Sequence, residues 1–295
     1  MSIKGEIKMR IKGMSLYDQG IDAYGNPLIF AQLERLVALG INYVSLTVYF
    51  DMATFNSNSV FYAGYCPDVA YIVAFIRKAH ELGLKVMFKP HVSCNDGRWA
   101  GRIYPTDWNA WFISYTALLV QYASVCQAEG VEIFCVGNEL SSSTGSDEVA
   151  PYPHEPNFNR SNWTETIRQV RSVFHGSLTY AAHVWTILDD SFPFDLLDYI
   201  GCNPYFMVST SLTDTVDQIV QNWTTMSQNI GRSVIYSNYK GILLALKNKY
   251  GKPLLFTETC YYSLFSNVYT TFPNQQEQQW QANCFEAFFR VWNIE

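Results

Sequence analysis

Residues 131–140 read VEIFCVGNEL, and this stretch decides the fold class that we expect for the chain. Its first six residues are almost continuously apolar, which is typical of a strand that is buried on both faces of a parallel sheet. Two polar residues, Asn138 and Glu139, follow where that strand ends. A second stretch of the same kind, KPLLFTET at 252–259, places Glu258 directly after another apolar strand.

Strand-like and helix-like segments alternate outward from these two stretches. The strands are expected at 7–15, 41–50, 84–90, 131–136, 177–184, 199–206 and 253–257. The helices are expected at 27–40, 68–82, 107–129, 162–174, 214–250 with a break near Gly231, and 275–291. This alternation predicts parallel strands with crossover helices.

The chain of 295 residues suits one (β/α)8 TIM barrel, a fold that typically needs about 250 residues. We therefore predict a single α/β catalytic domain over residues 1–295. Seven strand–helix units are recognised, and an eighth strand is expected after the last helix. Either residues 292–295 begin that strand, which is then incomplete, or the barrel closes in another way.

The composition excludes several classes of partner. Apolar residues make up 48% of the chain and charged residues 16%, which is typical of a globular protein with a large core. The net charge of −6 and the lack of a Lys/Arg run argue against a nucleic-acid partner. No uncharged apolar stretch is long enough to span a membrane. The sequence leaves the oligomeric state open.

The N-terminus and the cysteines favour a cytoplasmic location by default. Residues 1–14 alternate Lys with apolar residues and lack the continuous apolar core of a signal peptide. The 7 cysteines are odd in number and scattered, so we expect free thiols in place of a disulfide framework. Secretion by another route stays open.

The two strand-end glutamates match the needs of glycoside hydrolysis. In a TIM barrel the active site lies at the C-terminal ends of the strands. Glycosidic cleavage needs one carboxylic acid to protonate the leaving oxygen and one carboxylate to attack the anomeric carbon or to activate water. A lone strand-end glutamate is equally well explained by a salt bridge or a cap, but Glu139 and Glu258 both follow strongly apolar strands. The other polar residues at strand ends are Asp51, Lys89, His91, Asn138, His183, Asn203 and Tyr205.

Several motifs, taken in order, resemble clan A of the retaining glycoside hydrolases, and within it glycoside hydrolase family 113, whose members are mainly endo-β-mannanases. They are LTVYF at 46–50, KPHV at 89–92, DGRW at 96–99, PTDWNAWFISY at 105–115, FCVGNEL at 134–140, LTYAAHVW at 178–185, LLDYIGCNPYF at 196–206 and KPLLFTET at 252–259. The resemblance implies a retaining β-glycosidase, most similar to enzymes that cleave β-1,4-mannan.

The resemblance also implies roles for individual residues. Glu139 would be the acid/base, Glu258 the nucleophile, Asn138 a donor to the sugar 2-hydroxyl and Tyr205 the residue that orients the nucleophile. Further substrate-binding residues are expected at His91, Trp99, Lys89, His183, Asn203, Tyr261 and Tyr262.

Three positions depart from the family pattern. Cys260 and Tyr262 stand where members more often have Gly and Arg, and His183 replaces a more usual Asn. These departures concern the sugar specificity and leave the two glutamates in place.

Two alternatives remain beside this interpretation. One is a non-catalytic glycan-binding barrel within a larger assembly, which would keep the aromatic residues but would not need two strand-end glutamates. The other is a glycosidase of the same clan that acts on a different sugar. A metal-dependent hydrolase built on His91, His183 and Asp51 lacks any metal-ligand spacing. Because no nucleotide-binding motif appears either, we expect no metal and no cofactor.

Overall fold

The computed structural model describes residues 10–16, 20–146, 155–229, 235–261 and 274–292. The chain falls into two compact units. Unit 1 comprises residues 1–100, 105–138 and 162–179, and unit 2 comprises residues 101–104, 139–161 and 180–295. The prediction of a single domain over the whole chain stays a prediction.

Unit 1 is built on a mainly parallel sheet. Its strands are β1 (Gly13–Leu16), β2 (Tyr43–Met52), β4 (Lys85–Cys94), β5 (Ile133–Asn138) and the start of β6 (Ser177–Ala181). They lie in the order β1-β2-β4-β5-β6, and the two-residue strand β3 (Phe61–Tyr62) pairs antiparallel with β2. Every residue of β5 is buried, and so is every residue of β2 except the first. This is expected for strands in a parallel sheet.

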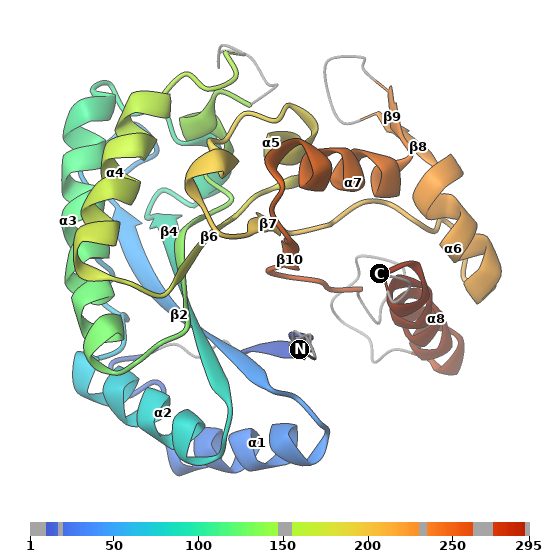
Figure 1. Ribbon diagram of the computed structural model, residues 1–295, viewed down its shortest axis with the longest axis horizontal. Coiled ribbons are helices and arrows are strands. Elements are labelled where there is room, and N and C mark those ends of the chain that lie inside the picture. Colours follow the sequence, from blue (N-terminus) through green and yellow to red (C-terminus); the bar gives the residue numbers. More distant parts are fainter. Residues whose placement is uncertain (1–9, 17–19, 147–154, 230–234, 262–273, 293–295) are drawn as a thin grey trace, which may run out of the picture. The chain divides into compact units, whose positions relative to one another are not determined.

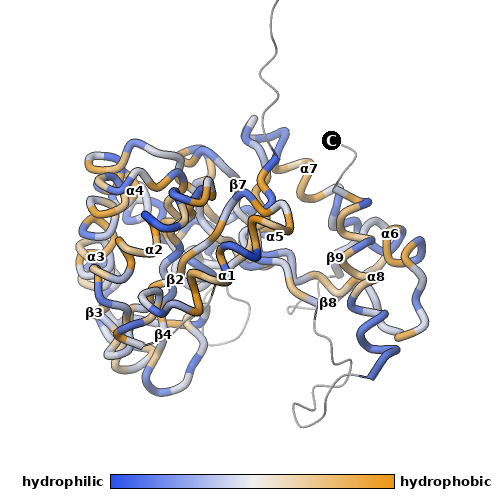
Figure 2. The backbone as a smooth tube through the Cα atoms, turned by 90° about the horizontal axis from the view of Figure 1, so that it is seen from below, coloured by the Kyte–Doolittle hydropathy of each residue, from blue (hydrophilic) through white to orange (hydrophobic). Residues whose placement is uncertain are grey.

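Four helices accompany this sheet. They are α1 (Pro27–Ala38), α2 (Val69–Glu81), α3 (Trp108–Ala128) and α4 (Arg160–Val173), and they lie along the outer side of β2 and β4 in Figure 1. The side chains of Asn26, Asp68 and Asp107 cap the first three, because each accepts a backbone N–H from the first turn. Hydrophobic and hydrophilic residues alternate along the helices (Figure 2), so that each helix buries one side.

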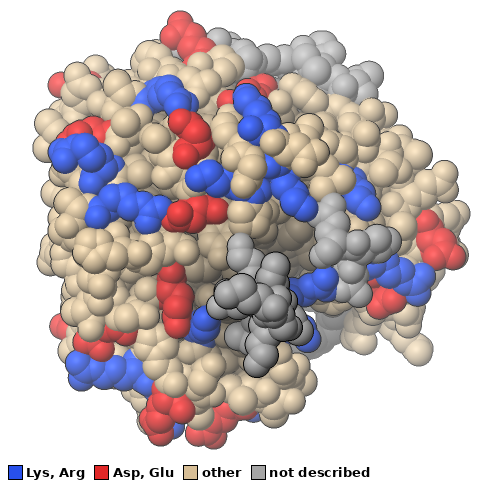
Figure 3. Space-filling view, viewed as in Figure 1, with Lys and Arg blue, Asp and Glu red and all other residues tan. Residues whose placement is uncertain are grey.

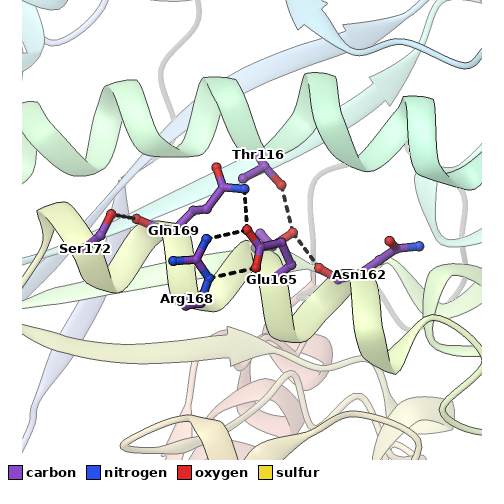
Figure 4. Close-up of polar contacts among 7 residues, drawn as sticks. Thr116, Asn162, Glu165, Arg168, Gln169 and Ser172 are labelled. Atoms are coloured by element: carbon purple, nitrogen blue, oxygen red, sulfur yellow. Dashed lines mark hydrogen bonds and ion pairs between the residues drawn. The ribbon is translucent and has the colours of Figure 1, made fainter.

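Helices α3 and α4 pack side by side through aromatic rings and one hydroxyl pair. The ring of Trp163 packs edge-on against Phe112 at 5.2 Å between centroids. The buried hydroxyls of Thr116 and Thr166 lie 2.8 Å apart (Figure 4). Where these helices face solvent, Lys and Arg are interspersed with Asp and Glu (Figure 3). Glu165, for example, forms an ion pair with Arg168 on the same helix.

Unit 2 carries the second half of the alternating pattern. Its elements after β6 are α5 (Val184–Leu188), β7 (Ile200–Cys202), α6 (Val216–Thr225), β8 (Ser227–Asn229), β9 (Ile235–Ser237), α7 (Tyr239–Tyr250), β10 (Leu254–Phe256) and α8 (Gln275–Trp292). Short 3-10 turns lie at Ala100–Arg102, Ser141–Thr144 and Phe194–Leu196. β10 pairs parallel with β7, and α6 packs on α8 through Trp223 and Phe288, whose ring centroids are 5.9 Å apart.

The predicted order of strands and helices is confirmed, and two details were wrong. The region 214–250 was expected to be helical with a break near Gly231, but β8 and β9 form an antiparallel pair between α6 and α7. The strand expected at 177–184 ends at Ala181, because His183 caps α5 instead. Residues 7–9 of the first expected strand and residues 293–295 of the eighth lie outside the described residues.

Two further expectations concern the whole chain. All seven cysteines lie in the described ranges and all are free, as their scatter predicted. Within those ranges, no helix is both long and apolar enough to cross a membrane.

Candidate active site

Backbone hydrogen bonds place the residues at the ends of β5, β6, β7 and β10 in one row, and those that form these bonds belong to unit 2. The N–H of Glu139, the first residue after β5, donates to Ala181 O at the end of β6, at 2.9 Å. The N–H of Asn203, just after β7, donates at 2.9 Å to the carbonyl oxygen of the residue that follows Ala181. The N–H of Thr257, just after β10, donates to Cys202 O at 2.9 Å. The residues that follow the four strands therefore succeed one another in space.

Glu139 has an unusual backbone conformation. Its φ is +51°, in the left-handed region that residues with a side chain seldom adopt. The following N–H, that of Leu140, is buried and donates to the hydroxyl oxygen of Tyr180 at 2.9 Å, which helps to hold the turn. Backbone strain of this kind costs on the order of 1–3 kcal/mol and is concentrated at functional sites.

The carboxylate of Glu139 is held by a chain of side-chain hydrogen bonds. The Nδ2 of Asn203 donates to Glu139 Oε1 at 3.0 Å. The hydroxyl of Thr257 donates in turn to Asn203 Oδ1 at 2.7 Å. Asn203 and Thr257 are 0% and 3% exposed, so this chain of bonds lies in the interior of unit 2.

The carboxylate of Glu258 is held by Tyr205. The phenolic hydroxyl donates to Glu258 Oε2 at 2.8 Å. Burial raises the pKa of Tyr205 far above its usual value, and the charge of Glu258 adds to this effect. The phenol therefore stays protonated and remains a donor to the carboxylate. This contact agrees with the orienting role that the resemblance implied for Tyr205.

His183 lies at the same strand ends, in a setting that keeps its ring neutral. Its Nδ1 accepts the backbone N–H of Trp185 at 3.3 Å, where it caps α5. Burial, followed by the nearby positive charge of Arg102, lowers the pKa of His183 from 6.5 to about 4. The Arg102 guanidinium also lies over the ring of Trp185, 5.1 Å from its centroid. The three side chains form one cluster in unit 2.

The other predicted binding residues of the early strands belong to unit 1. Asn138 is the last residue of β5, and its Nδ2 lies 3.5 Å from Nδ1 of His91. Lys89 lies within β4 and is only 1% exposed. The ring of Trp99 is 39% exposed, which suits a residue that contacts a ligand. Their roles in substrate binding stay predictions.

Of the two tyrosines beyond the last strand, Tyr261 differs from the expectation of an aromatic cleft. Tyr261 is buried, and its ring packs edge-on against Phe285 of α8 with the centroids 5.1 Å apart. Tyr261 therefore packs against α8, and its role in substrate binding stays a prediction. Tyr262 lies outside the described residues.

The sequence profile of Glycoside Hydrolase Family 113 matches residues 19–293, which is nearly the whole chain. The chain belongs to glycoside hydrolase family 113. It is therefore a glycoside hydrolase, and the interpretation of its motifs is confirmed at the level of the family. No curated protein is similar enough in sequence to be matched to it.

Solved structures of family 113 enzymes share the fold. A β-mannanase from Alicyclobacillus acidocaldarius is 25% identical with a TM-score of 0.76, and the match covers 97% of this chain and 83% of that one. A family 113 β-1,4-mannanase is 23% identical with a TM-score of 0.72, over 97% of this chain and 84% of that one. An endoglucanase from Pseudomonas stutzeri is 12% identical with a TM-score of 0.53, over 90% and 73%. The family 113 chain thus has the (β/α)8 fold that its sequence predicted.

Three residues near the two glutamates of this family 113 chain were not singled out from the sequence. They are Thr257, Trp185 and Arg102. Thr257 bonds to Asn203, the ring of Trp185 lies edge-on to His183, and the charge of Arg102 lowers the pKa of His183. Thr257 directly precedes Glu258, and this was the one feature of the sequence that could have indicated a site residue among the three. Among the described residues, no group of three or more His, Cys, Asp or Glu side chains is placed to hold a metal ion.

Proposed function

We propose that this family 113 chain is a retaining hydrolase of β-1,4-mannan or its oligosaccharides, with Glu139 as acid/base and Glu258 as nucleophile. One observation carries the proposal: both glutamates follow strands of the same row in unit 2, and each is held by a hydrogen-bond donor from the segment after β7. Such a pair is what glycosidic cleavage requires.

The chemistry proceeds by double displacement. Glu258 attacks the anomeric carbon while Glu139 gives its proton to the glycosidic oxygen, so that the leaving sugar departs as an alcohol. Glu139, now ionised, takes a proton from water, and that water attacks the anomeric carbon and releases Glu258. Two inversions at one carbon give net retention of configuration.

The donors at the two carboxylates fit these different tasks. The hydroxyl of Tyr205 stabilises the ionised form of Glu258, which the attack needs. The amide of Asn203 donates to Oε1 of Glu139 and so holds one oxygen of the acid/base carboxyl in place. The left-handed backbone of Glu139 fixes the direction in which its side chain leaves the strand end.

The choice of β-mannan rests on the relatives. Solved structures that share the fold are β-mannanases, one of them 25% identical to this chain. His183 and Cys260 differ from the residues usual in the family, and His183 lies in the row of strand ends beside Asn203. A change of sugar specificity within the same reaction is therefore the main alternative outcome.

The test is a panel of β-linked polysaccharides. Purified protein is incubated with β-mannan, β-glucan, β-xylan and β-galactan, and new reducing ends are measured. We expect β-mannan to be cleaved fastest, and NMR of the first product to show the β-anomer. Faster cleavage of another polysaccharide would reject the substrate, and an initial α-anomer would reject the retaining mechanism. Glu258→Gln serves as the control for contaminating activity.

A further inference from the structure

We propose that Thr257 is a positioning residue for the acid/base Glu139 and acts through the amide of Asn203. This inference rests on the proposed function, because it gives Glu139 the role of acid/base. It adds a residue that acts on Glu139 through Asn203, so its effect is expected on the acid/base and not on the nucleophile.

The three side chains form a directed chain of hydrogen bonds. Thr257 Oγ1 donates to Asn203 Oδ1 at 2.7 Å, and Asn203 Nδ2 donates to Glu139 Oε1 at 3.0 Å. The backbone on both sides is fixed, because the N–H of Asn203 and the N–H of Thr257 each bond to a neighbouring strand end. We call this chain of hydrogen bonds from Thr257 through Asn203 to Glu139 the relay. Because its backbone is fixed, the relay can move little apart from rotation of the Asn203 amide itself.

The direction of these bonds has a chemical consequence. A hydroxyl that donates into an amide carbonyl polarises the amide and strengthens its N–H as a donor. Asn203 then donates more strongly to Oε1, and a hydrogen bond to the ionised form of a carboxyl lowers its affinity for a proton. Asn203 thereby holds the carboxyl plane of Glu139 in one orientation toward the leaving oxygen.

The relay also ties the two catalytic residues together. Thr257 directly precedes Glu258, so the segment that carries the nucleophile also reaches the acid/base. The segment after β7 does the same, since Asn203 bonds to Glu139 and Tyr205 bonds to Glu258. The N–H of Tyr205 donates to Asn203 O at 2.9 Å, which closes this segment into a tight turn.

Two titratable groups of unit 2 feel the charge of Glu139. The thiol of Cys202 has a raised pKa because it is buried and because Glu139 is near. The hydroxyl of Tyr205 has a raised pKa through burial and the charge of Glu258, with a smaller effect of Glu139. Both stay neutral over the working pH range, so neither contributes to the limbs of the pH profile. The descending limb is expected to report Glu139 and the ascending limb Glu258.

The experiment compares Thr257→Val, which keeps the shape and removes the hydroxyl, with Thr257→Ser, which keeps the hydroxyl. Two substrates are used: a manno-oligosaccharide, whose leaving group needs the proton, and a dinitrophenyl β-mannoside, whose leaving group does not. The parameter is kcat/KM, which covers the steps up to the glycosyl-enzyme. Thr179→Val is the matched control, because the hydroxyl of Thr179 is fully buried and has no hydrogen-bond partner among the described residues.

We expect Thr257→Val to lower kcat/KM on the oligosaccharide about five- to tenfold, the loss that follows from one neutral hydrogen bond. The descending limb is expected to move to higher pH by about half to one unit. The dinitrophenyl substrate, Thr257→Ser and Thr179→Val are expected to show little change. An equal loss on both substrates, or a descending limb that stays in place, would overturn the proposal.

Two further variants keep the test decisive. If Thr257→Val does not fold, as judged by circular dichroism, the pair Thr257→Ala and Thr257→Ser gives the same comparison, with the shifted limb expected only for Ala. Glu139→Gln separates this proposal from the proposed function. If Glu139→Gln keeps full activity on the oligosaccharide, the acid/base role itself is wrong. If that activity is lost while Thr257→Val leaves the profile unchanged, only the relay is wrong.

Discussion

The glutamate on helix α4 of unit 1 and the two strand-end glutamates of unit 2 are held in different ways. Glu165 bonds to Arg168 at 2.6 Å and to Gln169 at 2.8 Å, both within one turn of its own helix (Figure 4). Glu139 and Glu258 instead accept hydrogen bonds from Asn203 and Tyr205, which lie more than fifty residues away in sequence.

The difference shows what a catalytic carboxylate needs. The guanidinium of Arg168, with help from Gln169, lowers the pKa of Glu165 to about 2, which leaves the group ionised and neutralised at the surface. Asn203 and Tyr205 are neutral donors, so they fix the direction of a carboxylate without cancelling its charge. A proton donor and a nucleophile both need that charge to change during the reaction.

The largest expected effect is the loss of either strand-end glutamate. We expect Glu258→Ala to lower kcat on an unactivated mannan on the order of 10⁴-fold or more, since no covalent intermediate can form. Glu139→Ala is expected to cost about 10²–10⁴-fold, the usual contribution of a general acid. Initial rates of reducing-end release measure both.

Azide distinguishes the two roles. With Glu139→Ala and a dinitrophenyl β-mannoside, azide is expected to attack the glycosyl-enzyme and to give the β-azide, with retained configuration. With Glu258→Ala, azide is expected to occupy the space of the missing carboxylate and to give the α-azide. NMR of the two products identifies the anomers. The same anomer from both variants would show that the roles are assigned wrongly.

The next effect concerns His183, a buried base in the strand-end region. Its pKa is about 4 in the folded protein, whereas an ordinary histidine has a pKa of 6.5. The folded state therefore disfavours protonation of His183. The stability linked to this group is present above pH 6.5 and is lost as the pH falls from 6.5 to about 4. The full shift corresponds to about 3 kcal/mol.

We expect His183→Asn to remove this part of the acid sensitivity. Asn is also a good N-cap residue, so the start of α5 is kept. Urea unfolding of both proteins between pH 7 and pH 4 measures the effect. The free energies of unfolding are expected to be similar at pH 7, and the wild type is expected to lose more by pH 4. Parallel curves would contradict the buried, neutral state of His183.

The contrast between the two regions also shows how far sequence alone reaches. The alternation of apolar strands and capped helices follows from local patterns, and Asn26, Asp68 and Asp107 sit at helix starts where their residue types predict them. Glu139 and Glu258 stand out because each follows an apolar run. Their partners come from distant segments, so the link from Asn203 to Glu139 needed the folded structure.

The errors have the same origin. A strand through His183 fits the apolar pattern, but the imidazole nitrogen accepts a backbone N–H and starts α5. Tyr261 was expected in a cleft because it follows a strand, yet the helix α8, far along the chain, buries it. Lys89 similarly follows the pattern of a strand-end polar residue but lies inside the ten-residue strand β4, which continues to Cys94.

Tyr205→Phe is expected to have a smaller effect on catalysis. The change removes one hydrogen bond to the ionised Glu258 and leaves the ring in place. A hydrogen bond to a charged group contributes about 1.5–3 kcal/mol, so kcat/KM is expected to fall about 10- to 100-fold. The ascending limb of the pH profile is expected to move to higher pH, because the ionised nucleophile loses a stabilising donor. A shift of the descending limb instead would mean that Tyr205 serves Glu139.

Glu165→Gln tests the other side of the comparison and is expected to have the smallest effect. The ion pair with Arg168 is fully exposed to solvent, so its attraction is screened and kcat/KM is expected to stay unchanged. Any stability that the pair adds is present above the ordinary pKa of 4.5 and is lost as the pH falls from 4.5 to about 2. We expect the Tm of the variant to lie about one degree or less below that of the wild type at pH 7. That small difference is expected to vanish as the pH falls to about 2. A clear loss of activity in Glu165→Gln would show that a carboxylate paired with a cation on its own helix also contributes to the chemistry, and the distinction drawn between the two regions would fail.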